Sequence, residues 1–190
     1  MRTALVLAAT AAALAVLPAC AAADDKCSVW RAQVDPTLEA KEISPRLLDD
    51  RERVTACECL LGEEGNTGPA RFSGATRAAV SAMLPDATVE VAALFYISYI
   101  YTGPWQHADG VALVDRENRV VTQAEVAGAY ASYRRWLARV KEVGMARARE
   151  LRLDPLENTD LCWYGSRRCY EMNSLGGMRT RALRPRGGSE

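Results

Sequence analysis

Residues 91–101 decide the fold, and they read VAALFYISYIY. Ser98 alone interrupts the run, and a helix that is apolar on all sides lies in the interior of a protein. With its flanking residues the segment is about 14 residues long, which exceeds an ordinary strand. Asp86 or Thr88 can cap its start, and the Gly103-Pro104 pair stops it. We therefore predict a central, buried helix.

The clearest amphipathic helix begins at residues 122–125, whose sequence TQAE is a capping box. Apolar side chains follow at alternating spacings of four and three residues: Val126, Tyr130, Tyr133, Leu137 and Val140. This period places them on one helical face. We expect Gly144 to bend the helix, arginines near residue 150 to suit its negative end, and the Asp154-Pro155 pair to terminate it.

A third helix is predicted from Ser44, which can cap it, and Pro45, which suits its first position. Its apolar face would carry four side chains, and Gly62 would end it in the left-handed conformation. The four are Leu47, Val54, Cys57 and Leu61. Residues 24–43 form a lead-in with a short helix, residues 63–69 a loop, and residues 75–84 a further short helix.

The apolar runs 111–114 and 119–121 flank a polar turn and predict a small β-hairpin. The chain has 190 residues, of which 49% are hydrophobic and 25% charged, and this composition is typical of one globular domain. We expect a single, mainly α-helical, disulfide-stabilised domain over residues 24–172, with the hairpin inserted before the long C-terminal helix. Residues 173–190, rich in arginine and glycine, are expected to be a disordered tail.

The N-terminus has the composition of an export signal. An apolar run over residues 4–17 follows Arg2, and it is shorter than the roughly 20 residues that a bilayer-spanning helix needs. Small residues before Asp24 predict removal of residues 1–23. In a second interpretation, residues 17–20 (LPAC) resemble a bacterial lipobox, and Cys20 carries a lipid anchor. Both interpretations place the protein outside the cytoplasm, in the periplasm, secreted, or anchored to the membrane.

Five cysteines remain after such processing, and an oxidising compartment favours disulfides. They are Cys27, Cys57, Cys59, Cys162 and Cys169. Cys57 and Cys59 point about 200° apart on a helix, so we expect no bond between them. We predict a bond between Cys162 and Cys169, and a second from Cys27 to Cys57 or Cys59. The alternative joins the Cys57/Cys59 helix to the C-terminal pair. The odd thiol would be buried or would link two chains.

The sequence predicts neither a metal ion nor an organic cofactor. Zinc sites need closely spaced Cys and His ligands, whereas the chain has one histidine and no pair of cysteines separated by two residues. The formal charge of zero, from 24 basic and 24 acidic side chains, argues against a nucleic-acid partner. Charge is unevenly distributed, since residues 163–190 hold six arginines against two glutamates, a net charge of +4.

Two features suggest catalysis as an alternative function. His107 could serve as the base for a cysteine nucleophile such as Cys59, although a helix C-terminus beside acidic residues raises a thiol pKa. Glu63 and Glu64 could supply the acid of a glycosidase, with a partner carboxylate such as Asp109. The corresponding function would be a cell-wall-directed hydrolase.

The leading prediction is a non-enzymatic bacterial envelope protein that binds another envelope or secreted protein, as an inhibitor or an immunity-type partner does. Tryptophan, tyrosine and arginine dominate binding hot spots. Two loops carry them together with the single histidine: Trp105, His107, Trp163, Tyr164 and Arg167. Tryptophan is highly buried on average, so burial of Trp105 and Trp163 against the helical core is the simpler interpretation.

Overall fold

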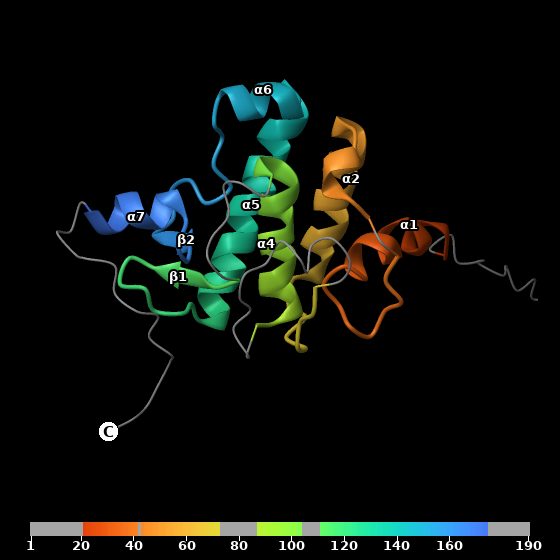
Figure 1. Cartoon of the computed structure of the whole chain (residues 1–190), viewed down its shortest axis with the longest axis horizontal. Helices are drawn as coiled ribbons and strands as arrows, with labels where there is room; N and C mark the ends of the chain where they lie inside the picture. The colour runs from red at the N-terminus through yellow and green to blue at the C-terminus, as the bar shows by residue number, and fades with distance from the viewer. Residues whose placement is uncertain (1–20, 42, 73–86, 104–110, 175–190) are drawn as a thin grey trace, which may run out of the picture.

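A computed structural model describes residues 21–41, 43–72, 87–103 and 111–174. It is mainly helical, with a two-stranded antiparallel sheet and two disulfides, which confirms the predicted fold class. Helices α2, α4 and α5 lie side by side in the middle of the molecule, while α1 and α7 lie at opposite ends of its long axis (Figure 1). None of the described helices is both long and apolar enough to cross a membrane.

Helix α4, Val89–Thr102, is the predicted central helix. All but two of its residues are buried, and Gly103, with φ +80°, follows its last turn. Thr88 occupies the N-cap position, but its side chain makes no capping hydrogen bond. The buried Glu90 carboxylate accepts hydrogen bonds from the Gly65 amide and the Gln123 side chain, both at 3.0 Å, and so joins α4 to its neighbours.

Helix α5, Gln123–Val143, confirms the predicted amphipathic helix. Thr122 and Glu125 form the reciprocal hydrogen bonds of the capping box. All five side chains of the expected apolar face are buried. Gly144, with φ +85°, separates α5 from the short helix α6, Met145–Glu150.

The helix predicted from Ser44 begins later than expected. Residues Pro45–Leu47 form a single 3-10 turn (η1), and α2 spans Asp50–Leu60. Asp49 caps α2, because its carboxylate accepts the Glu52 amide while the Glu52 carboxylate accepts the Asp49 amide. Leu47 is therefore outside the helix and 85% exposed, so its place on the apolar face was wrong.

The end of α2 also differs from the prediction. The chain continues into a second 3-10 turn (η2), Leu61–Glu63, and Gly62 does not adopt the left-handed conformation. Gly65, with φ +83°, makes the turn three residues later.

The strand β1, Leu113–Asp115, pairs with β2, Leu161–Trp163, and the register places Val114 opposite Cys162. The turn expected after β1 is present, since the Asp115 and Asn118 amides hydrogen bond around it and Val114 forms a bridge with Val120. The main partner of β1 is nevertheless a strand nearly fifty residues away in the sequence.

Helix α1, Ala21–Arg31, packs against α2 at the opposite end from α7, Arg167–Ser174. The expected cut after Ala23 thus falls inside a helix, and the first two residues of the expected tail belong to α7. The rest of the tail, the helix predicted over residues 75–84, and the signal segment before residue 21 lie outside the described residues.

Candidate functional site

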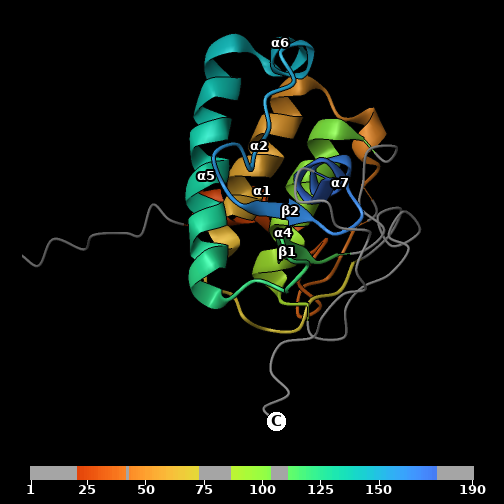
Figure 2. The same ribbon diagram turned by 90° about the vertical axis from the view of Figure 1, so that its left-hand side faces the viewer.

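A cavity of about 840 Å³ lies between the C-terminal ends of α4 and α6, the connection over residues 152–156, and the loop that leads from β2 into α7. Figure 2 looks onto the face that α7 and β2 form. This volume is in the range of small-molecule and peptide sites. The cavity is therefore the candidate binding site of the described structure.

Three buried side chains meet at the floor of the cavity. The Trp163 indole N–H points at both hydroxyls, 3.1 Å from Ser98 and 3.0 Å from Tyr133, and these two oxygens are 2.5 Å apart. The Ser98 hydroxyl also donates to the Leu94 carbonyl. Burial raises the pKa of Tyr133 far above its usual range, so the phenol stays protonated. The polar groups of the floor are paired with one another.

The rim of the cavity is cationic. Four arginines line it against two acidic residues, which gives a net charge of +2: Arg149, Arg152, Arg167, Arg168, Asp154 and Glu171. Low-dielectric walls strengthen the field that such a group of charges produces inside a cleft. The arrangement favours an anionic ligand.

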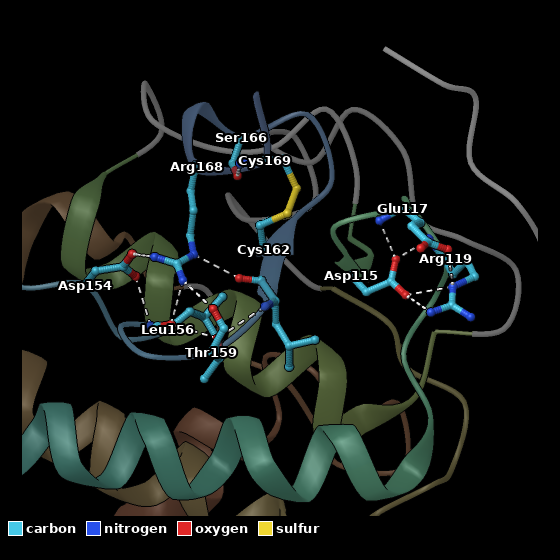
Figure 3. The surroundings of a disulfide bond; sticks show 11 residues. Asp115, Glu117, Arg119, Asp154, Leu156, Thr159, Cys162, Ser166, Arg168 and Cys169 are labelled. Atoms are coloured by element: carbon cyan, nitrogen blue, oxygen red, sulfur yellow. Dashed lines mark hydrogen bonds and ion pairs between the residues drawn. A yellow bond between two sulfur atoms is a disulfide. The ribbon is translucent and has the colours of Figure 1, made fainter. Parts of the chain in front are cut away.

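Two of these arginines hold the fold together. Arg168 donates to the Asp154 carboxylate and to three backbone carbonyls, those of Leu156, Thr159 and Leu161 (Figure 3). Arg149 donates to the Tyr101 carbonyl at 2.8 Å, and its guanidinium lies 5.9 Å from the centre of the Tyr101 ring. Arg149 also pairs with Asp50 of α2 at 3.7 Å. Both arginines are therefore engaged by the fold, and most of the donors of Arg168 are occupied.

The other two arginines are open to a ligand. Arg152 is exposed and forms no ion pair with any residue that the structure describes. Arg167 is 84% exposed and pairs with Glu171 one helical turn later. An exposed pair of this kind contributes little stability, so a ligand carboxylate can replace Glu171 at small cost.

The backbone at Arg152 is in the left-handed conformation, with φ +54°. It occupies the position after α6 at which glycine is the usual residue, because the Leu153 amide donates to the Ala148 carbonyl and the Arg152 amide to that of Arg149. An L-residue with a side chain pays about 1–2 kcal/mol for this conformation. The chain thus places an arginine where local geometry favours glycine.

The disulfide between Cys162 and Cys169, which confirms the prediction, closes the loop that walls the cavity. Ser166 caps α7, since its hydroxyl accepts the Cys169 amide at 3.3 Å. Figure 3 shows Arg168 reaching from α7 toward Asp154, Leu156 and Thr159, beside the disulfide. Two constraints, one covalent and one ionic, therefore hold this wall in place.

Among the residues predicted to bind a partner, Trp163 and Arg167 lie at the cavity. Trp163 is only 6% exposed, so it forms the floor and not a projecting anchor, as the simpler interpretation predicted. Tyr164 is half-buried and packs against a small cluster that includes Cys162 and Cys169. Trp105 and His107 lie outside the described residues.

The thiol of the alternative catalytic site is not available. Cys59 is bonded to Cys27, which confirms the predicted bridge from Cys27 to the Cys57/Cys59 helix and selects Cys59. The role of Cys59 as a nucleophile was therefore wrong, and so was Cys57 as the partner of Cys27. Cys57 points into the core and is fully buried, while Cys59 faces α1, where Cys27 lies. Burial, with a smaller contribution from Glu58, raises the pKa of Cys57 to about 12. A bond between two chains through Cys57 would require α2 to leave the core.

The carboxylates of the alternative site serve as structural contacts. Glu63 is buried and pairs with Arg31 of α1 at 2.6 Å, and it also accepts the Asn66 side-chain amide at 2.8 Å. Glu64 pairs with Arg134 of α5 at 2.5 Å. Each of the two carboxylates is therefore paired with an arginine from another helix, which is a structural role. Asp109 lies outside the described residues.

Most of the cavity was not predicted from the sequence. Trp163 and Arg167 were predicted as binding residues, and Ser98 stood out only as a lone polar residue in an apolar run. Arg149 and Arg152 were interpreted only as cations near a helix end. Their meeting with residues 163–171 depends on the pairing of β1 with β2, which no local pattern predicts.

In the described residues, no group of three or more Cys, His, Asp and Glu side chains is arranged to hold a metal ion. No protein-family model matches the chain, and the comparisons with curated proteins and with solved structures found no match either. The cavity is therefore the feature of the molecule that points to a function.

Proposed function

We propose that the chain is an exported binding protein that captures another envelope or secreted protein at the cavity, in the manner of an inhibitor or an immunity-type partner. The observation that carries the proposal is the cavity itself, with its closed aromatic floor and its partly unengaged cationic rim. Arginine and aromatic side chains at one concave site are typical of binding hot spots.

Export is supported by two independent features. The structure contains two disulfides. Such bonds persist in oxidising compartments and are rare in a reducing cytosol. The N-terminal sequence has the charge, the apolar run and the small residues of a signal peptide. Mass spectrometry of the protein recovered from bacterial envelopes tests this part of the proposal. A chain beginning at Asp24, or at an acylated Cys20, supports export, and an intact Met1 contradicts it.

The binding proposal is tested by site-specific photo-cross-linking. Benzoylphenylalanine replaces Glu171 at the cavity in one protein and Arg71 in another, and each is irradiated in an envelope extract. Arg71 is an exposed cation that does not line the cavity, and its amide donates to the carbonyl of Val34, shortly after α1. We expect one defined adduct from position 171 and none from position 71.

A competition experiment tests whether the adduct forms at the cavity. An excess of parent protein without benzoylphenylalanine should abolish the adduct, and an excess of the Arg152→Glu, Arg167→Glu double variant should not. The same adduct from both positions, no adduct, or equal competition by the double variant would overturn the proposal.

A further inference from the structure

We infer that the cavity recognises a carboxylate-bearing peptide segment, whose acidic groups contact Arg152 and Arg167 and whose neighbouring apolar side chain lies on the floor at Trp163. The inference rests on the proposed function and names the chemistry of its ligand. The carboxylate can come from an acidic side chain or from a peptide C-terminus, and the experiment below separates these two sources.

The charge around the cavity selects for anions. The rim carries a net charge of +2, and the two acidic residues on it already face arginines, Asp154 with Arg168 and Glu171 with Arg167. Arg149 is compensated from outside the rim, because it pairs with Asp50 of α2 at 3.7 Å and donates to the Tyr101 carbonyl. Among the described residues, the uncompensated rim charge is therefore that of Arg152. A planar guanidinium binds a carboxylate through two parallel hydrogen bonds.

The sequence that follows α7 is also cationic. Residues 175–190 hold four arginines against one glutamate, a net charge of +3. This C-terminal segment of the chain is itself cationic, so its charge opposes its own binding in the cavity. An acidic partner is complementary to both the rim and the C-terminal segment.

The floor selects for an apolar group beside the carboxylate. Its three polar side chains satisfy one another, so an apolar ligand group covers them without leaving a donor or acceptor unpaired. Leu153 and Leu156 complete the apolar lining. A free inorganic anion would leave this surface uncovered, whereas a peptide segment of a few residues fills it.

The conformation of Arg152 is consistent with a binding role for its side chain. At this position glycine would relieve the strain of φ +54°, but glycine would also remove the rim cation that has no ion-pair partner among the described residues. Stability and ligand binding therefore favour different residues at position 152, and a single substitution can separate them.

The test measures binding of short blocked peptides to the full chain by NMR. The signal followed is the Trp163 indole N–H, assigned with Trp163→Phe. The probes are Ac-Glu-Phe-Glu-NH₂, its neutral counterpart Ac-Gln-Phe-Gln-NH₂, and Ac-Gln-Phe-Gln-OH, which has only a terminal carboxylate. Sodium phosphate and a twelve-nucleotide oligo(dT) serve as competing anions. We expect the acidic peptide to bind at least tenfold more tightly than the neutral one, a difference of about 1.4 kcal/mol.

Variants assign the effect to the cavity. Arg152→Gly should weaken the acidic peptide about tenfold while leaving the protein folded, with a thermal midpoint at or above that of the parent. Arg152→Lys keeps the charge but loses the two parallel hydrogen bonds, so it should weaken the acidic peptide less than Arg152→Gly does, and Arg71→Gly should change nothing. Binding should also weaken as sodium chloride rises, because salt screens these contacts.

The outcomes separate the two sources and the two proposals. Tighter binding of the C-terminal acid than of the acidic peptide assigns the site to peptide C-termini, and the reverse assigns it to side chains. Equal affinity of the neutral peptide and both carboxylate-bearing peptides, tighter binding of phosphate or oligo(dT), or an unchanged affinity in Arg152→Gly overturns the inference. A partner that cross-links at position 171 despite such a result leaves the proposed function standing and removes only its acidic ligand.

Discussion

The guanidinium of Arg168 donates to the carboxylate of Asp154, fourteen residues earlier in the chain. The same side chain donates to the carbonyls of Leu156, Thr159 and Leu161. One cation thereby fixes the connection after α6 and the start of β2 against α7. The two sides of the cavity are held at this point, so the site depends on a residue that need not touch a ligand.

Substitution of Arg168 should therefore destabilise the protein strongly. We expect Arg168→Met to lower the free energy of unfolding by about 3 kcal/mol, because an ion pair and three charge-assisted hydrogen bonds are lost. The neighbouring Arg167→Met should cost no more than about 0.5 kcal/mol, since its ion pair is exposed. Urea denaturation of both variants measures the difference, and a loss of no more than about 0.5 kcal/mol for Arg168→Met would contradict its structural role.

The two disulfides should contribute unequally. In the chain-entropy model, the Cys27–Cys59 bond with a sequence separation of 32 stabilises by about 3.7 kcal/mol. The Cys162–Cys169 bond with a separation of 7 stabilises by about 2.5 kcal/mol. Paired Cys→Ser variants test this order by urea denaturation. Amide exchange should increase mainly in α7 for the second pair, and an increase spread over α2 and α4 would contradict the local role.

The thiol of Cys57 should be unreactive in the folded protein. In a chain beginning at Asp24, two disulfides leave one thiol, and its pKa of about 12 leaves only on the order of one thiolate in ten thousand at pH 8. We expect less than about 0.1 equivalent of reaction with Ellman's reagent before unfolding and one equivalent in guanidinium. A full equivalent in the native state would mean that α2 opens readily.

Asp115 should make stability depend on pH in the acid range. Burial alone would raise the pKa of its carboxylate, but the Arg119 and Glu117 amides and the Arg119 side chain outweigh burial and lower the pKa below 3.8 (Figure 3). A lowered folded pKa adds stability above the unfolded value, and this stability is lost as the pH falls through the folded pKa. Asp115→Asn should therefore be less stable than the parent at pH 7, with a smaller difference at pH 2.5. A constant difference in urea midpoint across these pH values would contradict this account.

Sequence signals within each segment were sufficient to predict the two longest helices, α4 and α5. The apolar run around Ser98 and the following Gly103 predicted α4, and the Thr122-to-Glu125 box predicted α5, because each signal lies within the segment it describes. The start of α2 was predicted wrongly where two local signals competed. Ser44 with Pro45 and Asp49 with Glu52 both resemble helix starts, and the reciprocal pair of hydrogen bonds at Asp49 prevails.

Long-range contacts could not be predicted in this way. The choice between Cys57 and Cys59 depends on which face of α2 meets α1 and which meets the core, and neighbouring residues do not specify that contact. The cavity is a stronger case. Its floor joins Ser98, Tyr133 and Trp163 from three elements, and only the assembled fold brings them together.

Replacing Arg152 by glycine should stabilise the protein, whereas glycine within a helix ordinarily destabilises it. Its left-handed backbone costs an L-residue about 1–2 kcal/mol, and glycine removes that cost while adding about 0.5–1 kcal/mol of unfolded-state entropy. We therefore expect Arg152→Gly to raise the free energy of unfolding by about 0.5–1 kcal/mol.

Arg147→Gly provides the matched control, because it removes the same side chain from within α6. Arg147 is exposed and helical, so glycine there should lower stability by about 1 kcal/mol. Urea denaturation of both variants at pH 7 shows whether each substitution raises or lowers the free energy of unfolding. If Arg152→Gly also destabilises, the arginine side chain contributes to the fold through contacts that outweigh its backbone strain, and strain at position 152 no longer supports a binding role. If Arg152→Gly stabilises the protein and weakens binding of the acidic peptide, then arginine at position 152 lowers the stability of the fold and increases the affinity for the ligand.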